Sequence, residues 1–150
     1  MKRQLLLWLA TVGGVGYLPL MPGTWGTLAG GPLWWLMAGL KPGHYGIVLL
    51  GLLILSVWAT GWAEVYLGQR DASAIVIDEV VGLLVALAGR PRHWGWVLGG
   101  FLLFRVFDIW KPFPIFLIDE QIKGGAGIVL DDVLAGIYAW LVLTLLSRVI

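Results

Sequence analysis

The fold class is decided by residues 44–67, HYGIVLLGLLILSVWATGWAEVYL. A helix needs roughly 20 apolar residues to cross a hydrocarbon core of about 30 Å, and this stretch is long enough. Its one acidic residue, Glu64, lies near the carboxyl end. The stretch does not alternate polar and apolar residues as a membrane barrel strand does, so it predicts a membrane helix.

The composition of the whole chain agrees with this prediction. Of the 150 residues, 59% are hydrophobic and 13% are charged, and the mean hydropathy is +0.89. These values lie outside the soluble average and exclude a soluble globular enzyme. Ten tryptophans suit the membrane–water boundary. The lack of cysteine excludes disulfides, thiolate zinc sites and cysteine phosphatases, and the net charge of +1 excludes a nucleic-acid surface.

Five apolar segments are expected to build one helical bundle. They run from Trp25 to Leu40, His44 to Leu67, Ala74 to Gly89, Trp94 to Ile109, and Asp131 to Ile150. Several are shorter than a full crossing, so we predict an all-α, multi-pass membrane bundle of about four to five spans. The chain shows no internal repeat and no domain boundary, so residues 1–150 are expected to form a single membrane-embedded domain.

A shorter apolar run precedes these segments. Leu5 to Val12 follows Lys2 and Arg3, which predicts a short N-terminal helix lying in the membrane interface. A secretory signal can share this pattern, but no A-x-A cleavage site follows it.

Alternating helix directions would gather all nine acidic residues on one side of the bundle. These residues are Glu64, Asp71, Asp78, Glu79, Asp108, Asp119, Glu120, Asp131 and Asp132. The other side would hold Lys41, Arg90, Arg92, His93 and Arg148, which we interpret as ordinary loop and terminal charges. We therefore expect the polar chemistry at one end.

Six of the acids lie near ends of predicted spans, where a bound cation would offset their charge. They are Glu64, Asp78, Glu79, Asp108, Asp131 and Asp132, and the nearby bases are Arg105, Lys111 and Lys123. A carboxylate at the centre of a span costs roughly 2.5 to 3.5 kcal/mol on insertion scales. Ligands that are all oxygen select a hard cation such as Mg²⁺ or Mn²⁺ over zinc. His44 and His93 fall on the far side and are not expected to be ligands.

Each acidic signal also has a purely structural explanation. Asp78–Glu79 and Asp131–Asp132 could cap the helices that they open, because acids favour helix N-termini. Asp108 could simply pair with Arg105 three residues earlier, and Glu64 could extend to the interface from a helix end. We interpret Asp71, Asp119 and Glu120 as solvated residues.

Two glycine-containing segments could contact a phosphate. Gly124 and Gly125 open the run Gly-Gly-Ala-Gly after Lys123, and backbone N–H groups before a helix can bind an anion. The same run could equally be a flexible turn. Thr24 follows Pro22-Gly23 at the start of the first segment, so its hydroxyl is expected to face the acidic side.

Four blocks along nearly the whole chain carry a family resemblance. They are GYLP at 16–19 with PGTWGT at 22–27, Asp71 with IVIDEVVG at 75–82, FRVFDIWKPFPI at 104–115, and GGAGIVLDDVLAG at 124–136. Together they resemble the phosphatidylglycerophosphatase A family of bacterial membrane lipid phosphatases. The last two blocks are the most specific. Glu120, where a basic residue is expected, and Val129, where Met is usual, depart from the family pattern.

The resemblance implies a Mg²⁺-dependent, multi-pass enzyme of the bacterial inner (cytoplasmic) membrane. It would remove the terminal phosphate of phosphatidylglycerophosphate to leave phosphatidylglycerol, with the phospholipid substrate staying in the bilayer. The site would face the cytoplasm, where this substrate is made. The metal ligands that follow from the resemblance are Asp78, Glu79, Asp108, Asp131 and Asp132, with Glu64 as a further match.

The residues themselves narrow the mechanism by elimination. The sequence has neither the D-x-D-x-T/V element of aspartyl-phosphate enzymes nor the S-G-H block of histidine lipid phosphatases. Attack by a cation-activated water is therefore favoured, and an aspartate nucleophile stays open. The predicted catalytic residues are Asp108, Asp131, Asp132, Arg105 and Lys111, and the predicted substrate contacts are Thr24, Lys111, Lys123, Gly124 and Gly125.

Two other functions compete with this prediction. Carboxylates within a membrane often mark ion paths, so a divalent-cation transporter or channel is the main alternative. Transporters commonly have paired repeats and bind at mid-membrane, unlike this chain. A noncatalytic subunit whose charges only pair helices is the third alternative, and the sequence leaves the oligomeric state open.

Overall fold

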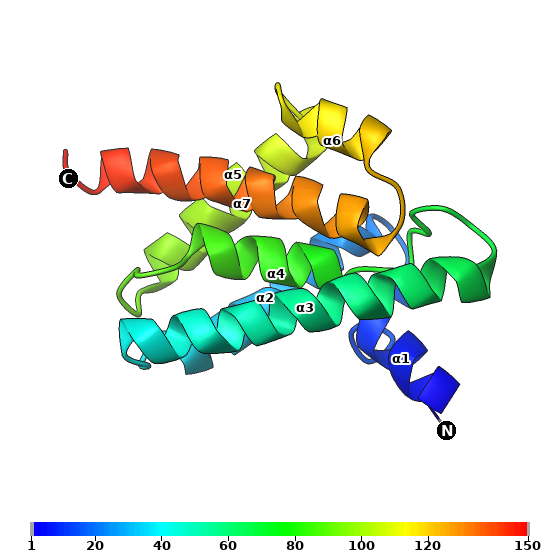
Figure 1. Ribbon diagram of the computed structural model, residues 1–150. Coiled ribbons are helices and arrows are strands. Elements are labelled where there is room, and N and C mark those ends of the chain that lie inside the picture. Colours follow the sequence, from blue (N-terminus) through cyan, green and yellow to red (C-terminus); the bar gives the residue numbers. More distant parts are fainter. Residues whose placement is uncertain (1, 150) are drawn as a thin grey trace.

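The computed structural model of the protein describes residues 2–149, and the predicted all-α class is confirmed for this part of the chain. Seven α-helices and one short 3₁₀-helix, η1 (Val15–Tyr17), follow one another (Figure 1). The α-helices are α1 (Lys2–Ala10), α2 (Pro22–Met37), α3 (Pro42–Leu67), α4 (Ile77–Ala86), α5 (Trp94–Trp110), α6 (Ile115–Gln121) and α7 (Gly125–Leu146).

Successive long helices run in alternating directions. The starts of α2, α4 and α7 and the ends of α3 and α5 therefore lie at the same end of the bundle, on the right in Figure 1. We call this the acidic end. Residue 149 and the α2–α3 and α4–α5 connections lie at the opposite end.

The short helix α4 is the centre of the bundle. It contacts α2, α3, α5 and α7, and eight of its ten residues are buried. Its closest approach is to α7, where a Cβ placed on Gly136 would overlap the carbonyl oxygen of Gly82. At about 15 Å, α4 is shorter than the predicted segment Ala74–Gly89, and its neighbours are four other helices.

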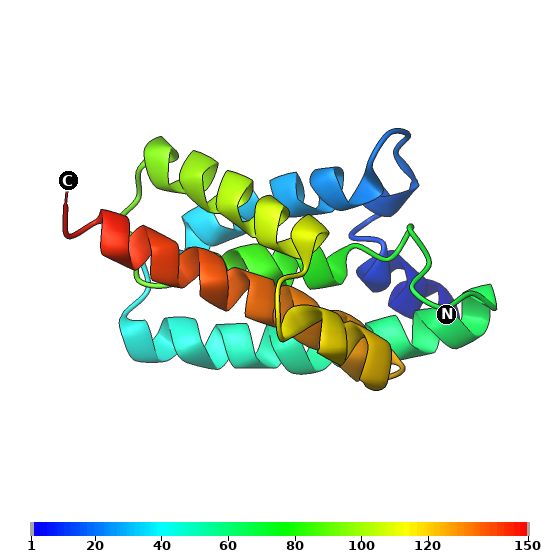
Figure 2. The same cartoon turned by 90° about the horizontal axis from the view of Figure 1, so that it is seen from above.

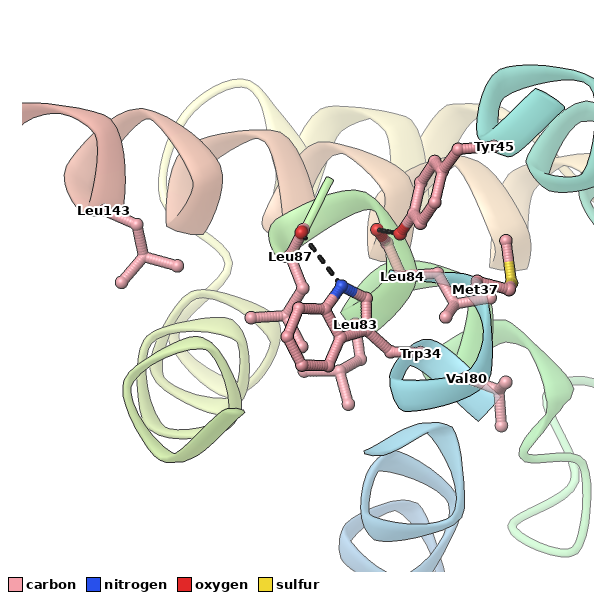
Figure 3. Close-up of a cluster of buried hydrophobic side chains, with 8 residues drawn as sticks. All are labelled: Trp34, Met37, Tyr45, Val80, Leu83, Leu84, Leu87 and Leu143. Carbon is pink, nitrogen blue, oxygen red and sulfur yellow. Dashed lines mark hydrogen bonds between the residues drawn. The ribbon is translucent and has the colours of Figure 1, made fainter. Parts of the chain in front are cut away.

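Side chains from neighbouring helices satisfy the carbonyl groups at the end of α4. The Trp34 indole donates to the Leu87 carbonyl at 3.0 Å, and the Tyr45 hydroxyl donates to the Leu84 carbonyl at 2.6 Å (Figure 3). Trp140 donates to the Ala88 carbonyl at 2.9 Å. A buried helix end leaves several carbonyls without intrahelical partners, so these bonds allow α4 to end inside the molecule.

Two of the described helices, α3 and α7, are long and apolar enough to cross a membrane. The outer surface of α3 exposes Ile47, Leu50, Ile54 and Trp58, as a lipid-facing helix does. The helices α2 and α5 have 16 and 17 residues, which is short of a straight crossing. The structure thus shows two candidate spans of the four to five predicted.

The predicted boundaries are wrong between Trp110 and Leu130. The predicted segments leave residues 110–130 between the fourth segment and a last helix that begins at Asp131, but these residues contain α6 and the first turns of α7. Gly125 can begin α7 because its bare backbone packs on the carbonyl of Val57 and on Gly61 of α3. Asp131 therefore lies inside the helix, and helix capping does not explain it.

We expect Gly136→Ala to lower the free energy of unfolding by about 1–3 kcal/mol, the usual cost of overpacking. The added methyl group would meet backbone of α4, which cannot rotate away. Gly51→Ala is the matched control, because a Cβ on this α3 glycine meets nothing within 4 Å. Thermal unfolding of both purified variants in detergent measures the difference, and equal midpoints would contradict the close α4–α7 contact.

Candidate functional site

Three carboxylates from two helices meet at the acidic end. Asp78 and Glu79 lie in the first turn of α4, and Asp132 comes from the second turn of α7. One oxygen from each lies within 4.8 Å of the other two. Asp78 and Asp132 are only 5% and 4% exposed. We call these three residues the carboxylate triad.

The oxygens of the triad lack partners that would offset their burial. Asp78 Oδ1, Glu79 Oε2 and Asp132 Oδ2 are buried without a hydrogen bond in the described chain. Burying a charge without a partner is costly, and three like charges within this distance repel one another. An all-oxygen group with orphaned atoms fits a hard divalent cation, so these residues suit the ion that the sequence predicts.

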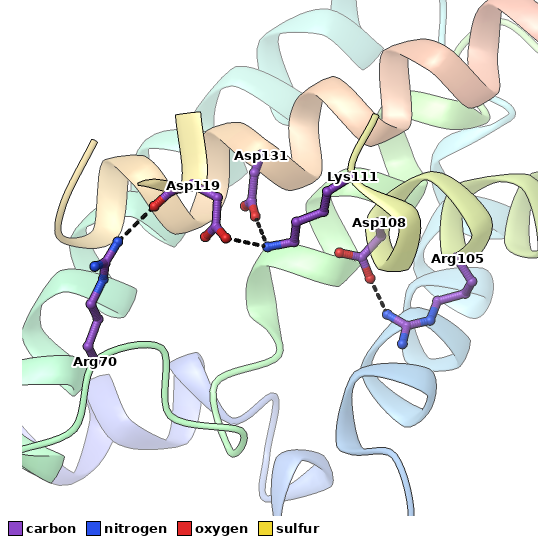
Figure 4. A network of polar contacts seen from close by, with 6 residues as sticks. All are labelled: Arg70, Arg105, Asp108, Lys111, Asp119 and Asp131. Atoms are coloured by element: carbon purple, nitrogen blue, oxygen red, sulfur yellow. Dashed lines mark hydrogen bonds and ion pairs between the residues drawn. The ribbon is translucent and has the colours of Figure 1, made fainter. Parts of the chain in front are cut away.

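Basic side chains border the triad from α5. The Lys111 ammonium lies 2.7 Å from Asp131 Oδ2 and 3.1 Å from Asp119 Oδ2, and so joins α7 to α6 (Figure 4). Arg105 forms an ion pair with Asp108 on the same helix face, as the spacing predicted. The Arg105–Asp108 pair and Lys111 therefore place two cations beside the acids.

A cleft of about 420 Å³ opens at this end of the bundle. Its polar wall is formed by Asp71, Ser73, Glu79, Arg105 and Asp108, and its other lining residues are Met21, Pro22, Gly23, Ile75 and Ile109. Glu79 belongs both to the triad and to this wall. A ligand in the cleft would therefore reach one triad carboxylate and one guanidinium at once.

The first turn of α2 packs closely against the charged groups of the cleft because it has a glycine there. A Cβ on Gly23 would overlap Glu79 Oε1 and approach Arg105 Nη1 to 3.1 Å. The missing side chain lets the α2 backbone come up against the two charged groups. Gly23 thus has a steric role in the site that its place in the sequence block did not specify.

The connection between α3 and α4 is held over the site by two bonds. The Asp71 amide donates to Glu64 Oε1 at 2.9 Å. The Arg70 guanidinium donates to the Asp119 carbonyl oxygen at 2.7 Å (Figure 4). Glu64, predicted as a metal ligand, accordingly lies at the end of α3 as an anchor for this connection and outside the carboxylate triad.

Charged groups shift one another's pKa at the rim of the site. Desolvation raises the pKa of Asp71, the charge of Lys111 opposes this, and the nearby Asp119 and Glu64 raise it further. The pKa of Lys111 is raised above its usual value, because its bonds to Asp131 and Asp119 outweigh the opposing effect of its burial. Lys111 therefore stays a cation at neutral pH.

Some predicted site residues lie apart from the triad and the cleft wall. Lys123 is exposed in the connection between α6 and α7. Gly124 lies just before α7 and has a backbone φ angle of +77°. Gly125, the first residue of α7, packs against α3. Thr24 is half-buried in the first turn of α2, next to Gly23.

Two residues interpreted from sequence as solvated belong to the site. Asp71 lines the cleft, and its position in the second sequence block was a usable signal. Asp119, which is partly exposed, pairs with Lys111, a contact that the sequence did not predict. It comes from a short helix in an irregular stretch, where no spacing rule relates it to Lys111.

The sequence of the chain is similar to those of several known proteins. The family model "Phosphatidylglycerophosphatase A" matches residues 8–147. Phosphatidylglycerophosphatase A of Escherichia coli (strain K12) is 38% identical over 125 residues, covering 83% of this chain and 73% of the relative. The protein of the same name from Haemophilus influenzae is 41% identical over 143 residues, covering 86% and 80%.

A third relative has a different name. A Bacteroides thetaiotaomicron protein, named as a candidate phosphatidylinositol-3-phosphatase, is 35% identical over 145 residues and covers 91% of this chain and 90% of its own. No solved structure matches the chain significantly.

We expect Asp78→Asn to have opposite effects with and without a cation. Without one, the variant should unfold at a higher temperature than the wild type, because one of two buried acidic side chains that repel each other is gone. With MgCl₂, the wild type should gain about 2.7 kcal/mol at roughly 100 times the dissociation constant, and the variant should lose most of this gain.

Thermal unfolding in EDTA and in MgCl₂ measures both effects. Glu120→Gln is the matched control, because Glu120 is an exposed acid of α6. An Asp78→Asn protein that keeps the full magnesium shift would remove Asp78 from the cation site.

Proposed function

Because the chain belongs to the phosphatidylglycerophosphatase A family, we propose that its acidic end hydrolyses the terminal phosphomonoester of phosphatidylglycerophosphate. The products are phosphatidylglycerol and inorganic phosphate. One observation carries the proposal. Glu79 belongs to the carboxylate triad and also lines the cleft that Arg105 lines.

The carboxylate triad is proposed to hold Mg²⁺. Its donor atoms are all carboxylate oxygens, and those without partners are buried. When bound, such a cation supplies polarisation of the phosphoryl oxygens and activation of a water molecule for in-line attack. Asp108 and Asp131 were also predicted as ligands, and we propose that they act next to the triad through their bonds to Arg105 and Lys111.

Arg105 and Lys111 are proposed to stabilise the charge on the transferred phosphoryl group. Fixed cations aimed at a developing negative charge are a large part of catalysis in a site with little water. Asp108 and Asp131 hold these cations in place. Since these two carboxylates are already ion-paired, we favour water over an aspartate as the nucleophile.

Several further residues complete the proposal. Thr24, Lys123, Gly124 and Gly125 stay predictions as substrate contacts, and Asp132 stays a prediction both as a metal ligand and as a catalytic residue. Asp71 is a further candidate contact, because it lies on the cleft wall.

We propose that the bundle is embedded in the inner membrane, with its acidic end at the cytoplasmic surface. The helices α3 and α7 would cross the bilayer, α2 and α5 would cross with local thinning, and α1 would lie in the interface. Six basic residues lie at the acidic end and four at the other, which agrees with the positive-inside rule. They are Lys2, Arg3, Arg70, Arg105, Lys111 and Lys123 against Lys41, Arg90, Arg92 and Arg148.

The purified protein with Mg²⁺ should release inorganic phosphate from phosphatidylglycerophosphate, and EDTA should stop this release. Asp108→Asn and Asp131→Asn should each lower kcat at least a hundredfold, because they release cations that stabilise the transition state, at a typical cost of about 10²–10³. Glu120→Gln should keep wild-type activity. Full turnover in EDTA would refute the cation-dependent mechanism, and wild-type rates in both variants would refute the assigned site.

Gly23→Ala should lower kcat about tenfold to a hundredfold while leaving the unfolding temperature nearly unchanged. The added methyl group displaces Glu79 and Arg105 by a fraction of an ångström, and such misplacement can cost up to about 10²-fold in rate. Gly43→Ala is the control, because Pro42–Gly43 opens α3 as Pro22–Gly23 opens α2, and nothing lies within 4 Å of its Cβ. Equal phosphate release by both variants would contradict the steric role of Gly23.

A further inference from the structure

We propose that an apolar groove between α2 and α5 binds one acyl chain of the lipid substrate while its phosphate occupies the cleft. This inference rests on the proposed lipid phosphatase function. The groove has a volume of about 440 Å³. It is lined by Thr27, Leu28, Gly31, Leu83, Trp94, Gly95, Val97, Leu98 and Phe101.

The groove continues the catalytic cleft along the same two helices. Gly23 of α2 and Arg105 of α5 line the cleft, and Thr27 and Phe101 line the groove. Each of these positions lies four residues, about one helical turn, from its counterpart in the cleft. α2 and α5 contact each other and both contact α4 (Figure 2). The groove therefore lies about one helical turn from the cleft on both helices.

The surfaces of the groove suit a hydrocarbon chain. Its lining is almost wholly apolar, and Gly31 leaves room where a larger residue of α2 would fill the space. A Cβ on Gly31 would meet its nearest neighbour, Val97, only at 3.6 Å. Leu28 and Leu98 are 48% and 61% exposed, so the groove is open sideways to the surroundings of the bundle.

The length of the seam also suits one lipid leaflet. Helical rise puts roughly 16 Å between Arg105 and Trp94, and one leaflet contributes about 15 Å of hydrocarbon. At the far end, the ring of Trp94 stacks on Trp35 with centroids 4.7 Å apart. This aromatic pair joins α2 to α5 and closes the groove.

Other apolar cavities lack this continuity. One of about 220 Å³ lies between α1, α2, α3 and α4, with Trp8 and Leu55 in its lining. Another, of about 560 Å³, lies beside Tyr45 and Arg90 at the end opposite the acids. A phosphomonoester lipid has its phosphate and acyl chains in one molecule, and of these three cavities the α2–α5 groove is the one that lies a helical turn from the cleft on both α2 and α5.

The test is the chain-length dependence of turnover in mixed micelles. The substrates are dihexanoyl, dioctanoyl, didecanoyl and dimyristoyl phosphatidylglycerophosphate. For the wild type, kcat/KM should rise with chain length, because each methylene group buried in the groove adds binding free energy. Leu28→Trp fills the groove from its rim and should flatten this rise, with a loss on the order of tenfold for the longest substrate and little change for the shortest.

Leu36→Trp is the matched control, because Leu36 is an exposed leucine of α2 that does not line the groove. It should keep the wild-type rise. Leu98→Trp repeats the test from α5, so that a folding defect in one variant does not decide the result.

Two outcomes would overturn the proposal while the phosphatase function stands. One is a wild-type rate that does not depend on chain length. The other is Leu28→Trp and Leu98→Trp proteins that keep the wild-type rise or lose activity equally on every substrate. A wild-type protein that releases phosphate from none of the four lipids would instead refute the proposed function.

Discussion

The structure depends on holding together two buried carboxylates and a partly buried one, although they repel one another. Ion pairs do not supply this force, because within the described residues the ion-paired bases Arg105 and Lys111 contact Asp108, Asp119 and Asp131. The force comes from the close packing of α4 on α7, where backbone meets backbone at Gly82 and Gly136. Apolar burial along this contact fixes Asp78 and Asp132 in place before any ligand is bound. A cation bound there, as proposed, would meet acids already in position, and little binding free energy would be lost to ordering them.

The direction of α4 adds to this arrangement. Asp78 and Glu79 lie in its first turn, where the helix dipole favours negative charge. Its other end needs hydrogen-bond donors, and Trp34, Tyr45 and Trp140 provide them. One short helix thus has acids at one end and indole and phenol donors at the other. Reversing α4 would place the acids against backbone carbonyls and leave both ends unsatisfied.

Much of the acidic end could be predicted from the sequence, because alternation of apolar segments fixes which segment ends meet. That reasoning placed Asp78, Glu79 and Asp132 together without knowledge of any contact. It failed where tertiary packing overrides local preference. The glycine-rich run before Asp131 was interpreted as a phosphate contact or a flexible turn. Gly125 and Gly127 are instead helical, and the neighbouring backbone leaves no room for a side chain at either position.

The pairing of Asp119 with Lys111 could not be predicted for a related reason. Lys111 ends α5 with a positive φ of 47°, and this conformation is uncommon for a residue with a side chain. The chain direction after α5 then decides where α6 lies, and no periodicity in the sequence encodes that direction. Glu64 shows the converse case, since a carboxylate at the correct helix end forms a bond to the Asp71 amide and not to its acidic neighbours.

The site divides its tasks between two pairs of helices. The triad belongs to α4 and α7, whose glycine contact tolerates little change, whereas α2 and α5 contribute to the cleft and form most of the groove beyond it. Glu79 is shared by the triad and the cleft, so it couples the two pairs. If the groove holds an acyl chain, as proposed, substitutions along the α2–α5 seam should alter which lipid fits without moving Asp78 or Asp132. Substitutions between α4 and α7 act on the acids themselves, because the backbone that carries those acids forms the contact.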